Sequence, residues 1–237
     1  MAHLKPRFCL ELGQTRKSYN MIMEHIFLQF LVIIIFLTVV FLHVSKKNST
    51  AITLYLIQSL AITAVLLVSF FGTYSILLLA VALLTFTVKA IIAPLFFSRL
   101  VKKHQLKFSA STYMNAPTTL IMVAILTAIT SSHLFAPLVS IIPANEKILS
   151  LSMAVILIAF FLIINRKGAI SQMIGILSLE NGIVSFAIFS GLEQAPGLQA
   201  GIMFNIFIWV MIATMFASMI YKQFGSLDVT EMKSLKE

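Results

Sequence analysis

The residues of this sequence that could carry chemistry are two charged side chains inside long apolar segments. Glu180, in segment 170–191, is the only one of eight acidic residues in such a segment, and Lys89, in 74–97, is the only one of seventeen basic residues. A charged side chain at membrane depth costs at least about 2.5–3.5 kcal/mol and typically belongs to an ion or proton pathway. We therefore interpret Glu180 and Lys89 as the candidate site.

Both residues also have simpler interpretations. Glu180 could be protonated and serve only as a hydrogen-bonding anchor between helices. Lys89 could extend its side chain toward the membrane interface. Arg99, at the basic end of the same segment, is ten residues away, which is about 15 Å of helix and farther than a lysine side chain reaches. This separation favours a functional or paired lysine.

The composition indicates an integral membrane protein. Of the 237 residues, 59% are hydrophobic and only 11% are charged, and the mean hydropathy is +1.01. Such values are unlike those of soluble domains. The net charge of +9 comes from short loops, where basic residues determine membrane orientation and contact anionic lipid headgroups. We therefore expect membrane lipids, and not nucleic acid, as partners.

No pattern in the sequence indicates a redox or hydrolytic centre. Cys9 is the only cysteine, which excludes an intrachain disulfide and a thiolate cluster for iron–sulfur or zinc. The five histidines form no i, i+4 pair, and no glycine-rich phosphate-binding loop is present. We expect no catalytic residue, no metal and no cofactor in this chain.

The apolar segments predict an all-α integral membrane protein, a bundle of about seven transmembrane helices. Residues 1–23 lack the apolar core of a signal peptide and are expected to be a disordered or non-native tail. Residues 222–237 are expected to be a cytoplasmic tail. Between the tails we expect four helices within 24–140 and three within 147–221, at residues 24–43, 51–71, 74–97, 117–139, 147–164, 170–191 and 198–221.

Amide side chains and a proline accompany the two charges. Pro94, five residues after Lys89, should loosen or kink the third helix and free backbone carbonyls. Gln58 in the second helix is expected to form an interhelical hydrogen bond. Asn205 in the seventh helix and Asn181, next to Glu180, are further amides. The candidate proton or ion pathway therefore consists of Glu180, Lys89, Asn205, Gln58 and Asn181.

The predicted helix 170–191 has two distinct faces. At 100° per residue, small residues recur at spacings of four and three along one stripe, and Glu180 falls on the opposite side. Small residues at this spacing let neighbouring helices approach closely in lipid. Both faces should therefore contact protein, and the predicted packing stripe is Ser171, Gly175, Ser178, Gly182 and Ser185.

The distribution of Lys and Arg predicts the orientation. The loops after the first, third and fifth helices and the C-terminal tail hold eleven of these residues, and the other loops hold one. The positive-inside rule then places the C-terminus in the cytoplasm. Seven helices leave the N-terminus outside, where four basic residues are anomalous, and a start at Met21 or Met23 would remove the conflict. Glu180 and Lys89 then lie at similar depth from the cytoplasmic side.

Four stretches carry a family resemblance when they are taken together and in order. They are Tyr55…Gln58-Ser59-Leu60, then Thr87-Val88-Lys89…Pro94-Leu95, then Gln172…Gly175…Leu179-Glu180-Asn181-Gly182, and last Gly225-Ser226-Leu227-Asp228-Val229…Leu235-Lys236. From about residue 55 to 237 the chain resembles the component E membrane subunit of hydrogenase-4 and formate hydrogenlyase.

The resemblance implies a role for the last three helices. In that family they are similar to subunit K of respiratory complex I and to the C component of multisubunit cation/proton antiporters. The carboxylate in the second helix of this unit belongs to a hydrated chain of charged residues, and Glu180 occupies the matching position. The complex I subunit usually has another glutamate in its third helix, where this chain has only Asn205. We expect Lys89 to replace that second titratable group.

The implied function is that of a non-catalytic membrane subunit of a complex I-like oxidoreductase in the bacterial cytoplasmic (inner) membrane. Antiporter-like and other membrane subunits are the implied partners, and proton or Na⁺ translocation would be driven by redox chemistry in separate chains. Three alternatives stay open: a purely structural bridging subunit, a subunit of a multisubunit cation/proton antiporter, and a self-contained transporter. The last would be supported by inverted repeats, which the sequence does not show.

Two geometries are compatible with opposite charges at matching depth. A direct ion pair would place the carboxylate within about 4 Å of the ammonium and favour both charged forms. A relay would leave a longer, water-filled gap, because each group must change protonation. We expect the relay, since a tightly locked pair titrates poorly.

Overall fold

The computed structural model describes residues 5–103, 112–140, 142–191 and, beyond them, residues 200, 201, 204, 207, 211, 214, 215, 218, 219 and 221. Within this part of the chain the regular structure is helical, apart from one isolated β-bridge between Thr112 and Arg166. The elements are α1 (Lys5–Val44), α2 (Asn48–Thr73), α3 (Ile76–Thr85), the π-helix η1 (Phe86–Ile92), α4 (Ala93–Lys103), α5 (Ala116–Thr130), α6 (Ala136–Val139), the 3₁₀-helix η2 (Pro143–Asn145), α7 (Glu146–Asn165) and α8 (Ala169–Phe189).

Five helical segments in the described residues are long and apolar enough to cross a membrane, which confirms the predicted all-α membrane protein. They are Met23–Val44, Asn48–Thr73, Ile76–Lys103, Pro143–Asn165 and Ala169–Phe189. Most of the predicted seventh helix, 198–221, and the tail 222–237 lie outside the described residues.

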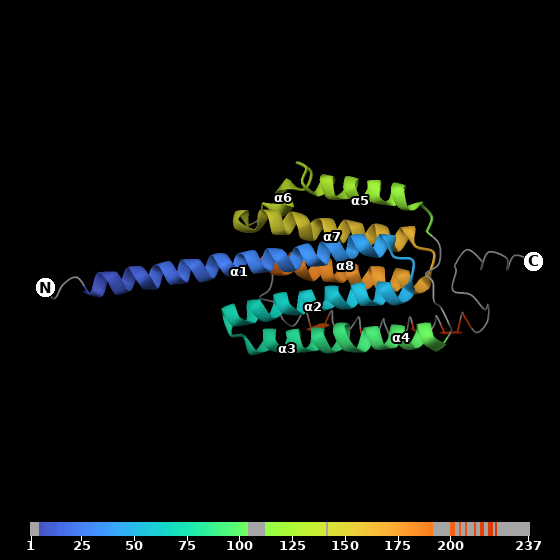
Figure 1. The fold of residues 1–237 in the computed structure, drawn as a ribbon, viewed down its shortest axis with the longest axis horizontal. Coiled ribbons are helices and arrows are strands. Elements are labelled where there is room, and N and C mark those ends of the chain that lie inside the picture. Colours follow the sequence, from blue (N-terminus) through green and yellow to red (C-terminus); the bar gives the residue numbers. More distant parts are fainter. Residues whose placement is uncertain are drawn as a thin grey trace, which may run out of the picture.

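The helices form a bundle with its axis along α1. Helices α1 and α8 each contact both α2 and α7, α3 and α4 flank α2, and α5 flanks α7 on the opposite side (Figure 1). The α1–α2 and α7–α8 turns lie together at one end of this bundle. We call it the basic end, because Lys46, Lys47, Arg99, Lys102, Lys103, Arg166 and Lys167 all belong to the segments that meet there. The opposite end, with the α2–α3 turn and α6, is called the far end.

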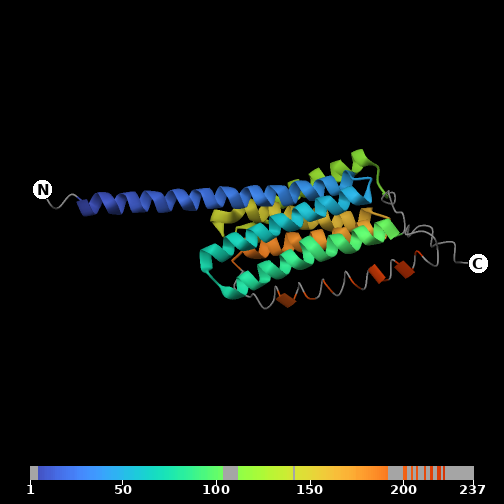
Figure 2. The ribbon, with the colours of Figure 1, turned by 60° about the horizontal axis from the view of Figure 1, so that its bottom comes forward.

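The N-terminal segment differs from the sequence-based expectation. Residues 5–23, which we expected to be a disordered tail, continue α1 as helix from Lys5. Figures 1 and 2 both show this part of α1 extending beyond the far end of the other helices. A helix needs only local hydrogen bonds, so the helix of an apolar span can continue into an adjoining polar segment.

The fourth predicted span is also shorter than expected. Helix α5 ends at Thr130, and its 15 residues correspond to about 22 Å, less than the roughly 30 Å of a bilayer core. The backbone N–H groups of Ser131 and Ser132 bond to carbonyls three residues earlier, and the Ser132 hydroxyl donates to the Ile129 carbonyl. These bonds terminate the helix before the polar segment and before Pro137, which lies in the first turn of the separate short helix α6.

The buried interior consists of two apolar clusters with polar side chains between them. The basic-end cluster comprises Leu42, Ala51, Ile52, Tyr55, Ala93, Phe97, Leu100, Leu162, Ile170, Ile174 and Leu177. The far-end cluster draws on α1, α2, α3, α7 and the end of α8. Buried polar residues of α2, α3, η1 and α8 lie along the chain between the residues of the basic-end cluster and those of the far-end cluster. We call these residues the polar layer: Gln58, Ser59, Thr85, Lys89, Ser178, Glu180 and Asn181.

Candidate functional site

The polar layer is centred on an ion pair between η1 and α8. The Lys89 ammonium lies 3.0 Å from Oε1 of Glu180, and the two side chains are 0% and 10% exposed. Lys89 also donates a hydrogen bond of 2.7 Å to Oδ1 of Asn181. One ammonium therefore contacts two consecutive residues of α8. At this depth the mutual attraction of the two charges offsets much of the cost of removing both from water.

The position of Lys89 depends on a π-helical turn. Residues Phe86–Ile92 form η1, in which the Ala93 N–H bonds to the carbonyl of Val88, five residues earlier. Pro94 follows directly and has no N–H to continue an α-helical ladder. The loosening predicted for this helix is thus a widened turn. Such turns often occur at functional sites, and this one places the Lys89 ammonium against α8.

The direct contact corrects the expected relay geometry. We expected a longer, water-filled gap between Lys89 and Glu180, and the 3.0 Å between the charged atoms shows that this expectation was wrong. Two unlike charges in an apolar surrounding gain most by approaching each other, because little solvent screens them. Matching depth in the sequence predicted proximity, but the rotation of each helix and the extra residue in the π-helical turn determine contact.

Gln58 joins the polar layer from α2. Its Oε1 accepts a hydrogen bond of 2.9 Å from the Ser178 hydroxyl, so it makes an interhelical bond of the kind predicted from the sequence. Several buried polar atoms of the layer have no hydrogen-bond partner within the described residues: Nε2 of Gln58, Oε2 of Glu180 and Nδ2 of Asn181. Buried polar groups are normally hydrogen-bonded, so the layer retains capacity for further hydrogen bonds.

Of the five predicted pathway residues, four lie together. Glu180, Lys89, Asn181 and Gln58 belong to the polar layer, with the contacts given above. The fifth, Asn205, lies outside the described residues. The second titratable group beside Glu180 is thus a lysine from another part of the chain.

The small residues of α8 pack against α7. A Cβ added to Gly182 would lie 2.9 Å from Cγ1 of Val155 and 3.1 Å from the backbone nitrogen of Ile156, and a Cβ on Gly175 would meet Ile163. Ser185 and Ser152 share a hydrogen bond of 2.8 Å. Close approach of the two backbones thus fixes the rotation of α8.

The remaining two members of the predicted stripe lie elsewhere on α8. Ser178 uses its hydroxyl toward Gln58 on α2. Ser171 is buried near the start of the helix. With α7 occupying the side of the two glycines, Glu180 on the opposite side of α8 is directed to η1 and Lys89.

Arg166 has a role that the sequence did not indicate. It looked like one of several loop charges, yet it is 4% exposed and donates to the backbone carbonyls of Leu42, His43 (2.9 Å) and Ser45 (2.8 Å). Leu42 and His43 belong to the last turn of α1 and Ser45 follows the helix directly, and a cation at this end also stabilises the helix dipole. Burial lowers the pKa of the Arg166 guanidinium. Nothing in an Arg-Lys loop pair identifies such a cap before the helices are assembled.

Neighbouring residues extend this junction. The Asn165 carbonyl accepts from the Tyr113 N–H at 3.0 Å, while its side chain accepts from the Met114 N–H and donates to the Thr119 hydroxyl. The Lys167 ammonium lies 5.0 Å from the centre of the Tyr113 ring. The turn between α7 and α8 therefore ties α1, α5 and the segment before α5 together at the basic end.

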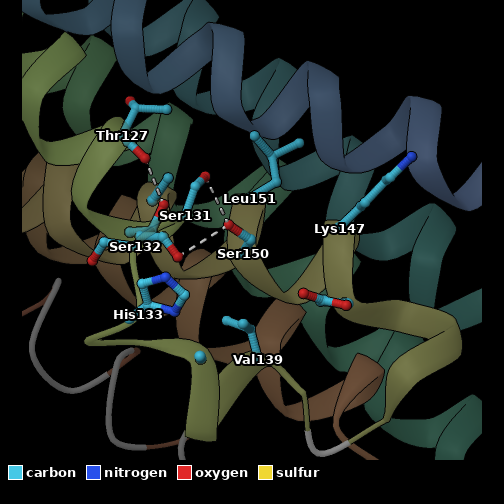
Figure 3. Close-up of a pocket in the computed structure, with 12 residues that line it drawn as sticks. Thr127, Ser131, Ser132, His133, Val139, Lys147, Ser150 and Leu151 are labelled. Atoms are coloured by element: carbon cyan, nitrogen blue, oxygen red, sulfur yellow. Dashed lines mark hydrogen bonds between the residues drawn. The ribbon is translucent and has the colours of Figure 1, made fainter.

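A cavity near the far end lies away from the ion pair. It has a volume of about 500 Å³ and is lined at the far end by hydroxyl side chains together with His133, Glu146 and Lys147 (Figure 3). The hydroxyls of Ser131 and Ser150 form a hydrogen bond of 3.4 Å in its wall, and Lys147 points away from His133. Neither Lys89 nor Glu180 lines it, so the cavity is not part of the candidate site.

Comparison with known proteins relates the C-terminal region of the chain to a known family. Residues 147–237, which include α7 and α8, match the family model described as NADH-ubiquinone/plastoquinone oxidoreductase chain 4L. An uncharacterized protein of Mycobacterium tuberculosis, Rv0085, is 25% identical over 162 residues, which cover 68% of this chain and 73% of the relative. No solved structure matches the chain significantly. The chain is therefore a membrane protein whose C-terminal region is similar to subunit K of complex I.

Proposed function

We propose that this chain is a membrane subunit of a complex I-like oxidoreductase, of the hydrogenase-4 or formate hydrogenlyase type, and that Glu180 and Lys89 conduct ions coupled to redox chemistry in other subunits. The similarity of residues 147–237 to chain 4L supports the membrane-subunit part of this proposal. The hydrogenase type rests on the four sequence stretches quoted above. Antiporter-like subunits in the bacterial inner membrane would be its neighbours, with the C-terminus in the cytoplasm.

The observation that carries the ion-conduction part is the buried ion pair at 3.0 Å. Transfer of one proton from the Lys89 ammonium to the Glu180 carboxylate converts two buried charges into two neutral groups. In a low-dielectric layer these two states can lie close in free energy, because the attraction lost is balanced by the desolvation cost removed. A small change in the surrounding field during redox turnover can then move the proton.

The surrounding apolar clusters indicate the direction of transfer. The basic-end cluster and the far-end cluster lie on either side of the polar layer, and neither offers a charged side chain in the described residues. The side chain of Glu180 retains 10% exposure, at the edge of the layer. Glu180 can therefore exchange protons with a neighbouring membrane subunit at this edge, and any exchange along the bundle must cross one of the two apolar clusters.

Replacing Glu180 by Gln tests the proposal in the intact complex reconstituted into vesicles. The amide keeps the size and hydrogen-bonding capacity of the side chain but cannot carry a proton. We expect the complex to assemble, to retain electron transfer and to lose ion translocation per electron. The matched control is Glu24→Gln, since Glu24 is exposed on α1. Full translocation in Glu180→Gln, equal to the control, would refute the ion-conducting role.

The second candidate function is a purely structural subunit that bridges a redox arm to antiporter-like subunits. The direct contact of Lys89 with both Glu180 and Asn181 favours it, because such contacts can lock η1 to α8 without any change of protonation. On this alternative, replacing both charged residues by apolar ones of similar size leaves translocation intact once the complex has assembled. On the proposed function, the same double variant assembles and does not translocate.

A further inference from the structure

The bundle interior between the polar layer and the basic end is almost entirely apolar. Among the buried side chains of the ranges 49–57, 90–100, 155–164 and 172–177, Tyr55 alone carries a polar atom, and the end of α1 adds Thr38, whose hydroxyl donates to the Ile35 carbonyl, and His43, which stacks on Phe161. Polar burial resumes only at the turns, with residues such as Asn48, Asn165 and Arg166. A charge that moves between the layer and the basic end along the interior must therefore pass the level of Tyr55.

Tyr55 is built into this apolar cluster with its hydroxyl uncommitted. Its side chain is 0% exposed and meets the Phe97 ring edge to face, with centroids 6.5 Å apart and an interplanar angle of 86°. The hydroxyl has no hydrogen-bond partner within the described residues, and neither has Oε2 of Glu180. The nearby Ser59 hydroxyl donates instead to the Tyr55 backbone carbonyl at 2.9 Å. Buried tyrosine hydroxyls usually find a partner.

The two uncommitted groups also belong to one electrostatic neighbourhood. The hydroxyl of Tyr55 interacts electrostatically with Glu180. Tyr55 lies one helical turn before Gln58 on α2, and Gln58 bonds to Ser178, two residues before Glu180. Tyr55 thus borders the polar layer on the side of the basic end. A single water molecule could join its hydroxyl to the free oxygen of the carboxylate.

We propose that the Tyr55 hydroxyl relays protons between the basic end and Glu180, and that this relay restricts the exchange to protons. The inference rests on the proposed function of Glu180 and adds the side of entry and the identity of the ion. Lys89 occupies Oε1 of Glu180, so the relay uses the other carboxylate oxygen.

The relay step conserves atoms and charge. A bridging water gives a proton to Oε2 of Glu180 and takes the proton of the Tyr55 hydroxyl, and a second water on the basic-end side returns a proton to the phenolic oxygen. One O–H bond forms on the carboxyl group, and the phenol is regenerated. The hydroxide left at the basic end takes up a proton from the bulk solution on that side, so the net result is the transfer of one proton from that side to Glu180, and no electron moves.

The same cluster opposes passage of Na⁺. A sodium ion needs several oxygen ligands to replace its water shell, and removing an ion from water without them costs far more than the ordinary energies of folding. The ranges given above offer one hydroxyl oxygen among their buried side chains, on Tyr55, and α1 adds the Thr38 hydroxyl, which is bonded to its own helix. A proton can cross on that single hydroxyl and transient waters, whereas Na⁺ would have to cross almost bare.

The test uses Tyr55→Phe, which removes only the hydroxyl, in the intact complex in vesicles turned over with reduced methyl viologen. Proton uptake is read with an internal pH dye and sodium uptake with radioactive sodium. We expect electron transfer and assembly to be retained and proton translocation per electron to fall roughly tenfold or more, as when a proton-transfer group is removed. Tyr74→Phe is the matched control, since Tyr74 is 75% exposed at the far end.

A second variant separates a relay from a packing role. Replacing Tyr55 by 3,5-difluorotyrosine keeps the ring and the hydroxyl but makes the hydroxyl more acidic. A relay predicts that the pH profile of translocation shifts to lower pH, whereas a ring that only fills space predicts an unchanged profile. Difluorotyrosine at Tyr74 should leave the profile where it is.

The outcomes distinguish this inference from the proposed function. If Glu180→Gln abolishes translocation while Tyr55→Phe matches wild type, the relay is refuted and the role of Glu180 stands. If both variants translocate normally, the proposed function fails as well. Sodium uptake coupled to electron transfer in the wild-type complex would also overturn the inference, whichever residue carries the ion.

Discussion

The ammonium of Lys89 and the carboxylate of Glu180 lie 3.0 Å apart. Lys89 belongs to the π-helical turn between α3 and α4, whereas Glu180 belongs to the regular helix α8. The π-helical turn η1 brings the lysine forward, and the glycine contacts of α8 with α7 direct the glutamate toward it. Two independent packing features therefore converge on one pair. Such convergence makes the pair sensitive to changes in either helix.

The ion pair should respond very differently to single and double replacement. Lys89→Met leaves the Glu180 carboxylate without its partner and should destabilise the protein by roughly 3–5 kcal/mol, whereas Lys89→Met combined with Glu180→Leu should recover most of that loss. The free energy of unfolding can be followed by titration with denaturing detergent. Lys147→Met, at an exposed lysine, serves as the control. Additive effects of the two single replacements would contradict a direct pair.

Gly182 should tolerate a methyl group less well than Gly175. At Gly182 a Cβ would press on the backbone nitrogen of Ile156 at 3.1 Å, while at Gly175 the nearest atom, 2.8 Å away, belongs to the Ile163 side chain. We expect Gly182→Ala to cost about 1–3 kcal/mol and Gly175→Ala less, measured by thermal unfolding.

The control for this comparison is Gly72, where an added Cβ meets nothing within 4 Å. Gly72→Ala should be neutral or stabilising by up to about 1 kcal/mol, since alanine favours helix. Equal losses at Gly72 and Gly182 would mean that backbone contact with α7 does not limit the site.

Arg166 should be required for the stability of the basic end. Replacing it with Met removes three hydrogen bonds to the end of α1 and should cost roughly 2–4 kcal/mol. Arg166→Lys should recover only part of this, because one ammonium cannot reproduce the planar guanidinium fork. Detergent titration measures both. Arg99→Met, at an exposed arginine, should change stability little, and an equal loss there would show that the cap contributes nothing specific.

The predicted orientation can be checked with reporter fusions. A fusion at Phe108 should read cytoplasmic, and fusions at Pro143 and Gly197 should read outside. The reason is that the basic residues are concentrated in the loops on the same side of the membrane as Phe108. An enzyme active only in the cytoplasm and one active only outside give opposite signals at each position. The reversed pattern would place the basic end outside and reverse the side from which protons reach Glu180.

The sequence predicted the helices more reliably than their ends. Long apolar runs determine that α2, α7 and α8 exist, because a membrane span must be helical and apolar. The predicted end of the fourth span was wrong, and the helix that contains the first span begins at Lys5, before the predicted start, although the span itself, Met23–Val44, agrees with the prediction. The end of α5 depends on a hydroxyl group that caps the helix, and the start of α1 depends on helix that continues into polar sequence. Both are decided by local hydrogen bonds, which hydropathy does not report.

The sequence by itself determined which residues matter in the membrane, since a single acid and a single base inside apolar segments stand out through their cost in lipid. It also placed them at similar depth. Only the tertiary structure decided that Lys89 and Glu180 touch, that Arg166 caps α1 and that Tyr55 borders the polar layer. The reason is that depth follows from counting residues along one helix. Contact depends on the rotation and spacing of several helices. These are set by close packing between segments that lie far apart in the sequence.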